Sequence, residues 1–333
     1  MRLGANLGGR DAAALLGVAR RAESLGFDSL WRGEAYGGDA VVPLAMAAAV
    51  TERVTLGSAI LQMPARTPTM TAMTAMHLDE LTGGRFVLGL GMSGPQVVEG
   101  WHGVPYGRPL RTTEEYVAIV RRIFAGDERV EFSGDRYRIP YDGDDATGLG
   151  KAMRPGLHTR ADIPVYLAAI GPKNVALATR IADGLLPILW SPTGWRDALD
   201  GALDGVDLDR FRIVATVPVA VGDDVQECRD AVKPFLALYV GGMGAKEKNF
   251  YNRLVRRYGY ESAAIEIQDR YLSGDRKGAI AAVPDALVDD LALVGPKERI
   301  AEHLEPWLTC GIHTLTIATP RSAAMTTLAE LVL

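Results

Sequence analysis

The 333-residue chain contains little cysteine, no long apolar run and no excess of basic charge. Its two cysteines, Cys228 and Cys310, are too few for a disulfide framework and fit buried thiols in a reducing compartment. No apolar run approaches the roughly 20 residues that a membrane-spanning helix needs. The N-terminal segment MRLGANLGGRD also lacks the apolar stretch of a signal peptide. The sequence therefore predicts a cytoplasmic protein that does not enter a membrane.

The charge balance and the missing motifs narrow the function further. Because 36 Lys and Arg stand against 41 Asp and Glu, the net charge is −5, and we expect no nucleic-acid partner. No spacing of His, Cys or Asp resembles a metal site, and the G-x-S-x-G turn of the α/β-hydrolases is absent. We therefore expect a small-molecule substrate and no bound metal.

What the chain does contain is a series of short apolar runs that alternate with helical patterns. Strands that alternate with helices pair in parallel through right-handed crossovers. Eight such units favour a (β/α)₈ TIM barrel over an open, doubly wound sheet, so we predict one α/β barrel domain over residues 1–333. The predicted strands are Leu3–Leu7, Phe27–Trp31, Val54–Leu61, Phe86–Leu90, Val165–Ala169, Leu185–Leu189, Ile213–Val219 and Leu315–Ile317.

Two connections are too long for simple loops, which predicts insertions after strands 4 and 7. After the fourth strand, Val130–Ile139 has the pattern of a small hairpin, and a polar, glycine-rich stretch follows over residues 141–160. After the seventh strand, residues 223–295 carry additional helical material. Insertions of this length usually act as lids or interaction surfaces.

Local signals predict where several helices begin. Asp11 is placed to cap the first helix, and Asp39 the second, Ala40–Thr51. Thr112 and Glu115 have the S/T-x-x-E spacing of a capping box, which predicts a helix start there.

A glycine-rich turn, Gly89-x-Gly91-x-x-Gly94, follows the fourth predicted strand. It matches the dinucleotide-binding pattern, but a Rossmann unit would require a second strand with a terminal acidic residue about 20 residues later. Here that region has the pattern of loop and helix. Two interpretations remain open: a structural turn, or a barrel loop that binds a phosphate or a ring.

The segment Gly171-Pro172-Lys173-Asn174 directly follows the fifth predicted strand. Proline at the first helical position is favourable, so the segment could be a plain helix start. Alternatively, the exposed N–H groups, the helix dipole and the lysine together form an anion site. In a barrel both glycine turns would face the carboxyl ends of the strands, and this coincidence favours a phosphate.

Two residues are candidates for proton transfer. Glu34 follows the second strand beside Tyr36 and could act as a general acid or orient a ring, or it could be a solvent-exposed loop residue. His102, between Trp101 and Gly103, could donate a proton or be a stacked structural histidine. The residues alone leave these alternatives open.

Several segments together resemble a known family. The chain is similar to the bacterial luciferase-like superfamily, and within it to the deazaflavin (coenzyme F420)-dependent oxidoreductases of actinobacteria. The segments are Gly57-Ser58-Ala59-Ile60-Leu61, Ala65-Arg66-Thr67-Pro68, Leu81-Thr82-Gly83-Gly84-Arg85-Phe86, Gly89-Leu90-Gly91, Ser93-Gly94-Pro95-Gln96, Trp101-His102-Gly103, Gly171-Pro172-Lys173-Asn174 and Val294-Gly295-Pro296.

The resemblance implies a barrel with the deazaflavin across the carboxyl ends of its strands. It implies a bulge after the third strand, with a non-prolyl cis peptide between Ala59 and Ile60 that supports the ring. It also implies assembly as a homodimer, and the candidates for catalysis remain Glu34 and His102. The cofactor-binding residues would be Ala59, Ile60, Arg66, Gly91, Ser93, Gly94, Gln96, Gly171, Pro172, Lys173 and Asn174.

The anionic tail of a deazaflavin should attract cationic residues around the site. The candidates are Arg66, Arg108, Arg111, Lys151, Arg154, Arg160 and Lys173. The chain also departs from the family. Members often carry Asp or Asp-His where this chain has Glu34-Ala35, and Gly94 replaces a glutamate for which Glu99 is the nearest substitute. These departures leave the proton donor and the substrate open.

Three functions follow from these expectations. The first is an F420-dependent oxidoreductase that transfers a hydride to or from a small organic substrate. The second is an FMN-dependent monooxygenase of the same fold, and the third is a catalytically silent binding protein. Asn6, Trp190, Trp195 and the 223–295 insertion are candidates to line the substrate pocket.

Overall fold

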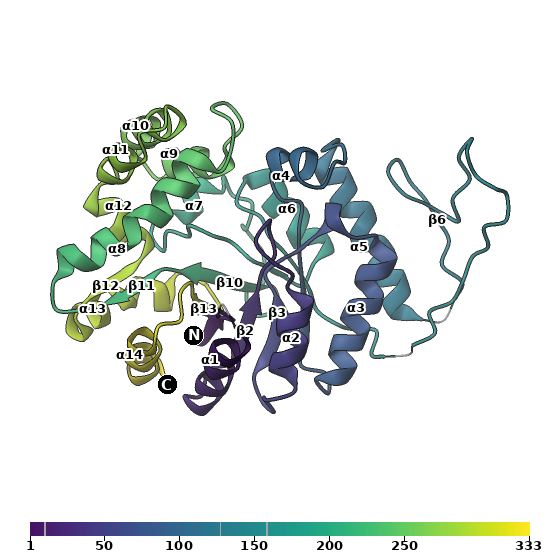
Figure 1. Ribbon diagram of the computed structural model, residues 1–333, viewed down its shortest axis with the longest axis horizontal. Coiled ribbons are helices and arrows are strands. Elements are labelled where there is room, and N and C mark those ends of the chain that lie inside the picture. The colour runs from purple at the N-terminus through teal and green to yellow at the C-terminus, as the bar shows by residue number, and fades with distance from the viewer. Residues whose placement is uncertain (10, 127, 158) are drawn as a thin grey trace.

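A computed structural model describes residues 1–9, 11–126, 128–157 and 159–333 and shows a closed parallel barrel with helices around it (Figure 1). Along the described chain, each barrel strand pairs in parallel with its two neighbours, and pairing of β3 with β5 and of β1 with β13 completes the ring. The predicted TIM barrel is thus confirmed. The barrel strands are β1 (Arg2–Asn6), β2 (Ser29–Arg32), β3 (Thr55–Ser58), β5 (Phe86–Gly91), β8 (Val165–Leu167), β9 (Gly184–Leu185), β10 (Arg212–Val217) and β13 (Thr314–Ile317).

Shorter strands extend or decorate this barrel. After β3 the chain is interrupted at a bulge and continues as β4 (Leu61–Gln62), which pairs with β5. The predicted hairpin is confirmed as the antiparallel pair β6 (Phe132–Ser133) and β7 (Arg138–Ile139). β11 (Val219–Val221) pairs in parallel with β12 (Leu293–Gly295), so the two ends of the second long connection lie together.

The helices cover the outside of the barrel and form an additional helical layer (Figure 1). No helix among the described residues has both the length and the apolar composition needed to cross a membrane. The helices are α1 (Ala12–Ser24), α2 (Val41–Ala48), α3 (Pro68–Leu81), α4 (Pro95–Gly100), α5 (Pro109–Ala125), α6 (Pro172–Ile181), α7 (Trp195–Ala198), α8 (Val225–Ala237), α9 (Phe250–Arg257), α10 (Glu261–Leu272), α11 (Arg276–Ala281), α12 (Asp285–Leu291), α13 (Lys297–Thr309) and α14 (Ser322–Val332), with the short turns η1 (Met63–Ala65) and η2 (Leu238–Gly242).

The interior of the barrel is filled with side chains. Trp31 and Tyr166 stack with their ring centroids 6.1 Å apart, and Val87, Leu186 and Val214 complete the same buried cluster. A ligand therefore cannot pass through the barrel and must lie on one of its ends.

The helix starts agree with the sequence signals in one case and differ in two. Asp11 accepts a hydrogen bond from Ala14 N at 2.8 Å, as a cap of α1. Asp39 accepts one from Val42 N at 2.7 Å, but the N-cap of α2 is Ala40, so this helix begins one residue later and ends earlier than predicted. The predicted capping box is wrong, because α5 begins at Pro109 and both Thr112 and Glu115 lie inside it. Proline at the first helical position starts this helix without a side-chain cap.

Helices α8 to α12 form a second hydrophobic core beside the barrel. Buried amides stabilise its irregular turn η2: Asn249 donates to Val240 O at 3.0 Å, and Asn252 donates to the same carbonyl at 3.1 Å. Tyr258, at the end of α9, donates to Leu189 O at 3.0 Å beyond β9. The helical layer is therefore attached to the carboxyl ends of the barrel strands.

Candidate functional site

The bulge after β3 lies at the carboxyl ends of the barrel strands, which we call the mouth. The peptide bond between Ala59 and Ile60 is cis, as the family resemblance implied. Neighbouring glycines make room for this backbone: a Cβ on Gly33 would lie 2.3 Å from Ala59 O, and one on Gly89 would lie 1.9 Å from Ser58 O. Both contacts are far inside van der Waals distance, so only glycine fits at either position.

The side chain of Glu34 is almost fully covered and joins three segments of the mouth. Its carboxylate accepts from Gln62 N at 3.0 Å, from Arg66 Nε at 3.3 Å and from Ala40 N at 3.4 Å. Arg66 also pairs with Asp39 at 2.8 Å. Burial alone would lower the pKa of Arg66, but the hydrogen bond and charge of Glu34, and the charge of Asp39, raise it. The alternative of a solvent-exposed loop glutamate is therefore wrong.

Gln62 connects this network to His102. The side chain of Gln62 is buried, and its Nε2 donates to Ala35 O at 3.0 Å. Its Oε1 therefore faces His102 Nε2, 3.4 Å away, as an acceptor. Because an amide oxygen cannot donate, His102 must carry a proton on Nε2 to make this contact. Sequence reasoning missed Gln62; its place at the carboxyl end of the third strand was the available signal.

Two helix starts meet at the mouth next to each other. α4 begins at Pro95 after Gly94, and α6 begins at Pro172 after Gly171, as predicted for α6; neither has a side-chain cap. They follow β5 and β8, which are adjacent strands. Uncapped helix starts leave backbone N–H groups for another partner, and these two therefore suit an anion.

The other predicted phosphate ligands lie around these two starts. Ser93 has φ 60°, an uncommon conformation that shapes the turn before α4. Gln96, Lys173 and Asn174 are exposed to solvent. An added Cβ on Gly171 would meet no atom within 4 Å, so the space beside it is open. The dinucleotide interpretation does not apply, because the glycine turn belongs to a closed barrel.

Two predictions of residues around the mouth are not supported. Arg160 forms two 2.9 Å hydrogen bonds with Asp79 and also reaches Phe86 O, at the amino end of β5, so its prediction as a residue of the mouth is wrong. The chain has already returned to the opposite end of the barrel there, to enter β8. Trp190 and Trp195 stack at 5.1 Å inside the main hydrophobic core.

Asn6 does lie at the mouth. Its side chain donates to Ala318 O at 3.0 Å, between the carboxyl ends of β1 and β13.

These features define a class: a (β/α)₈ barrel with a clamped cis bulge and two uncapped helix starts at one end. The chain belongs to the luciferase-like monooxygenase family, whose model matches residues 2–314.

Individual relatives agree with this assignment. The chain is 46% identical over 312 residues, 91% of its length and 89% of the relative's, to a Mycobacterium tuberculosis protein provisionally named a coenzyme F420-dependent oxidoreductase. It is 26% identical over 310 residues to a 5,10-methylenetetrahydromethanopterin reductase of Archaeoglobus fulgidus, covering 90% of this chain and 87% of that one. The structure of a coenzyme F420-dependent tetrahydromethanopterin reductase from Methanopyrus kandleri superimposes with a TM-score of 0.81 at 21% identity, over 99% and 98% of the two chains.

Proposed function

We propose that this protein is a coenzyme F420-dependent oxidoreductase that transfers a hydride between the deazaflavin and a small organic substrate. The observation that carries the proposal is the bulge at Ala59–Ile60, which Gly33 and Gly89 enclose closely, beside two helix starts suited to a phosphate. The name of the 46% identical mycobacterial relative supports the choice of cofactor.

The residues at the mouth fit such a cofactor. A flat ring needs a rigid apolar support, and the side chain of Ile60 lies against Gly91, where an added Cβ would come within 2.9 Å of it. Ala59 and Ile60 would support the ring, with Arg66 held nearby by Glu34. When bound, the deazaflavin supplies the ring carbon that carries the hydride. The phosphate would lie against the two turns that contain Gly91, Ser93, Gly94, Gln96, Gly171, Pro172, Lys173 and Asn174.

His102 is the residue to which we assign proton transfer. With Nε2–H donating to Gln62, the neutral ring keeps the lone pair of Nδ1 for a proton. The oxygens of Glu34 are occupied by Arg66 and by backbone N–H groups. We therefore assign Glu34 a positioning role, through Arg66 and Gln62.

A cofactor titration tests the proposal. The protein is expected to bind reduced F420 more tightly than FMN, and Lys173→Ala should weaken F420 binding while the far-ultraviolet circular dichroism stays unchanged. Added salt should weaken binding too, because exposed charges are screened over about 8–10 Å at physiological ionic strength. Tighter FMN binding, with oxygen consumption, would instead support the monooxygenase after which the family is named. Binding of neither cofactor would support the third function, a catalytically silent protein.

The assignment of His102 predicts a defined ring tautomer. In the neutral ring the proton should reside on Nε2, and Gln62→Leu should release this preference because it removes the acceptor. Nitrogen-15 spectra of the labelled imidazole measure both states. Gln226→Leu, on the surface of α8, is the matched control and should leave the ring unchanged. A wild-type ring protonated on Nδ1 would contradict the assignment.

A further inference from the structure

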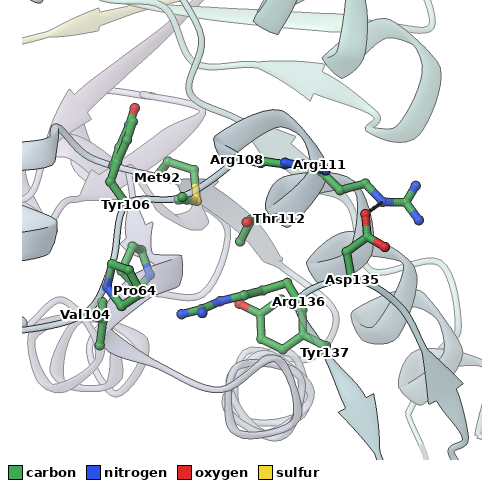
Figure 2. A pocket seen from close by; sticks show the side chains of 12 residues that line it. Pro64, Met92, Val104, Tyr106, Arg108, Arg111, Thr112, Asp135, Arg136 and Tyr137 are labelled. Atoms are coloured by element: carbon green, nitrogen blue, oxygen red, sulfur yellow. Dashed lines mark ion pairs between the residues drawn. The ribbon is translucent and has the colours of Figure 1, made fainter.

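A cavity of about 320 Å³ lies beside the mouth (Figure 2). One wall follows the ends of two strands, with Pro64 after β4 and Met92 after β5. The loop at residues 104–108 and the first turn of α5 continue the wall, and the β6–β7 turn closes it with residues 135–137. We call this space the arginine cavity.

The charges of the arginine cavity are unbalanced. Three arginines and one aspartate line it, which leaves a net charge of +2 in a chain whose total is −5. Arg111 is already paired, with Glu115 at 2.9 Å and Asp135 at 3.5 Å. Within the described ranges, Arg108 and Arg136 form no ion pair with any carboxylate, whereas Arg111 forms all the ion pairs of the lining arginines. Arg136 contacts the Tyr137 hydroxyl, and neither guanidinium charge is neutralised by a carboxylate of these ranges, so both charges can act on an anionic ligand.

The turn that carries Arg136 is fixed in place. Glu115 of α5 accepts hydrogen bonds from the backbone N–H groups of Asp135, Arg136 and Tyr137 at 2.8, 2.9 and 3.2 Å. Burial alone would raise the pKa of Glu115, but these bonds and the charge of Arg111 lower it. The carboxylate thus stays ionised and holds the turn, and Figure 2 shows the Arg136 side chain extending across the cavity from it.

The rest of the lining suits the body of an organic molecule. Pro64, Met92, Val104 and Pro105 supply apolar surface, and Tyr137 adds an aromatic ring. α5, a helix of 17 residues, begins at this wall without a side-chain cap, so its positive end adds to the field of the arginines. A cavity that combines apolar surface with cationic groups is typical of a site for an organic anion.

We propose that the arginine cavity binds an organic molecule with a carboxylate or phosphate group, held by Arg108 and Arg136, whose apolar part lies against Pro64, Met92 and Val104. The site stands whether or not the mouth binds F420. Two sources share this chemistry: the anionic tail of a deazaflavin bound in the neighbouring mouth, and an independent small anion such as a substrate.

Nuclear magnetic resonance of the intact protein tests the site with phenyl phosphate as the probe and benzyl alcohol as its uncharged counterpart. Phenyl phosphate should shift the side-chain Nε–Hε signals of Arg108 and Arg136 saturably. The double variant Arg108→Ala with Arg136→Ala should bind it at least about tenfold more weakly, because contacts with a charged partner are lost. Arg138→Ala is the matched control: it lies on the same hairpin, pairs with Asp142 and does not line the cavity. Its affinity should equal that of the wild type.

Two results would overturn the proposal: binding of phenyl phosphate no stronger than that of benzyl alcohol, or equal affinities of the double variant and Arg138→Ala. A second titration identifies the natural source. If the double variant binds F420 more weakly but binds the tail-less deazaflavin core as the wild type does, the anion is the cofactor tail. If both affinities are unchanged while phenyl phosphate binding is lost, the anion is a separate molecule. Failure of both deazaflavins to bind would refute the proposed function and leave the phenyl phosphate result to decide on the cavity.

Discussion

At the scale of single residues, Glu34 and Asp39 present the same charge to Arg66 in different surroundings. The side chain of Glu34 is 7% exposed and that of Asp39 is 41% exposed. When a buried carboxylate is replaced by a neutral group, the N–H groups that donate to it lose a charged acceptor and cannot turn to water instead. At an exposed carboxylate, water accepts those hydrogen bonds. The two acids therefore form a matched pair for measuring what the Glu34 network contributes.

Replacing Glu34 should destabilise the fold more than replacing Asp39. We expect Glu34→Gln to lower the free energy of unfolding by about 1–3 kcal/mol, because Arg66 and two N–H groups lose a charged acceptor. Asp39→Asn should cost less than about 1 kcal/mol, as for other exposed ion pairs. Urea unfolding of both variants measures the difference. Equal losses would show that the network contributes no more than a surface pair.

His313, at the entry to β13, gives the fold a dependence on pH. Burial, together with the charges of Arg212 and Arg2, lowers the pKa of His313 to about 4, and the charge of Asp28 opposes this shift. The unfolded state, with an ordinary value near 6.5, binds the proton more readily. Stability is therefore highest above pH 6.5 and falls as the pH drops from 6.5 toward 4, by less than the difference between the two pKa values alone would give, because solvent screens the half-buried ring.

Urea unfolding at pH 7.5 and pH 5 measures this loss. His313→Gln should reduce the difference between the two values, while His77→Gln, an exposed histidine of α3, should leave it unchanged. A wild-type difference that survives in His313→Gln would assign the effect to other groups.

At the scale of elements, the bulge depends on glycines in the neighbouring segments. Gly89→Ala places a Cβ 1.9 Å from Ser58 O, and the backbone of β3 must move to relieve it. We expect a loss of at least about 3 kcal/mol in stability, comparable to severe overpacking. Gly17→Ala in α1 is the control: its Cβ would meet nothing within 4 Å, and alanine should stabilise the helix by about 0.5–1 kcal/mol. Thermal unfolding of both variants should give shifts of opposite sign.

The sequence predicts the barrel strands well, and the helix starts and long connections less well, because the patterns for each report different physical properties. The barrel strands could be predicted because strand-length apolar runs report burial directly, and the bulge could be predicted only from the resemblance carried by residues 57–61. The capping box failed because the motif cannot show that Pro109 starts the helix earlier. Arg160 was misplaced because a long connection gives no signal of the barrel end at which it lies. Gln62 and the arginine cavity depend on contacts between segments far apart in sequence, which no local pattern reports.

At the scale of the whole molecule, one face of α3 is unusually apolar for an exposed surface. Met70, Met73 and Leu81 are 51%, 57% and 59% exposed, and with His77 they follow the helical spacing of a single stripe. Val42, 62% exposed, lies on α2, which packs beside α3 (Figure 1). Contiguous apolar surface of this kind marks interaction sites. It supports the homodimer that the family resemblance implied, which remains a proposal together with the single domain over residues 1–333.

The homodimer predicts that charge on this stripe separates the subunits. The chain has a mass of 35.8 kDa, so a dimer sediments at twice that mass, about 72 kDa. Met70→Glu combined with Met73→Glu should shift the mass to that of one chain, because two carboxylates would otherwise be buried without partners in the interface. Leu308→Glu, on α13, replaces an apolar residue that is 49% exposed outside the stripe and should leave the dimer intact. Analytical ultracentrifugation decides: a wild-type mass of about 36 kDa would refute the dimer, and a double variant that remains dimeric would place the interface on another face.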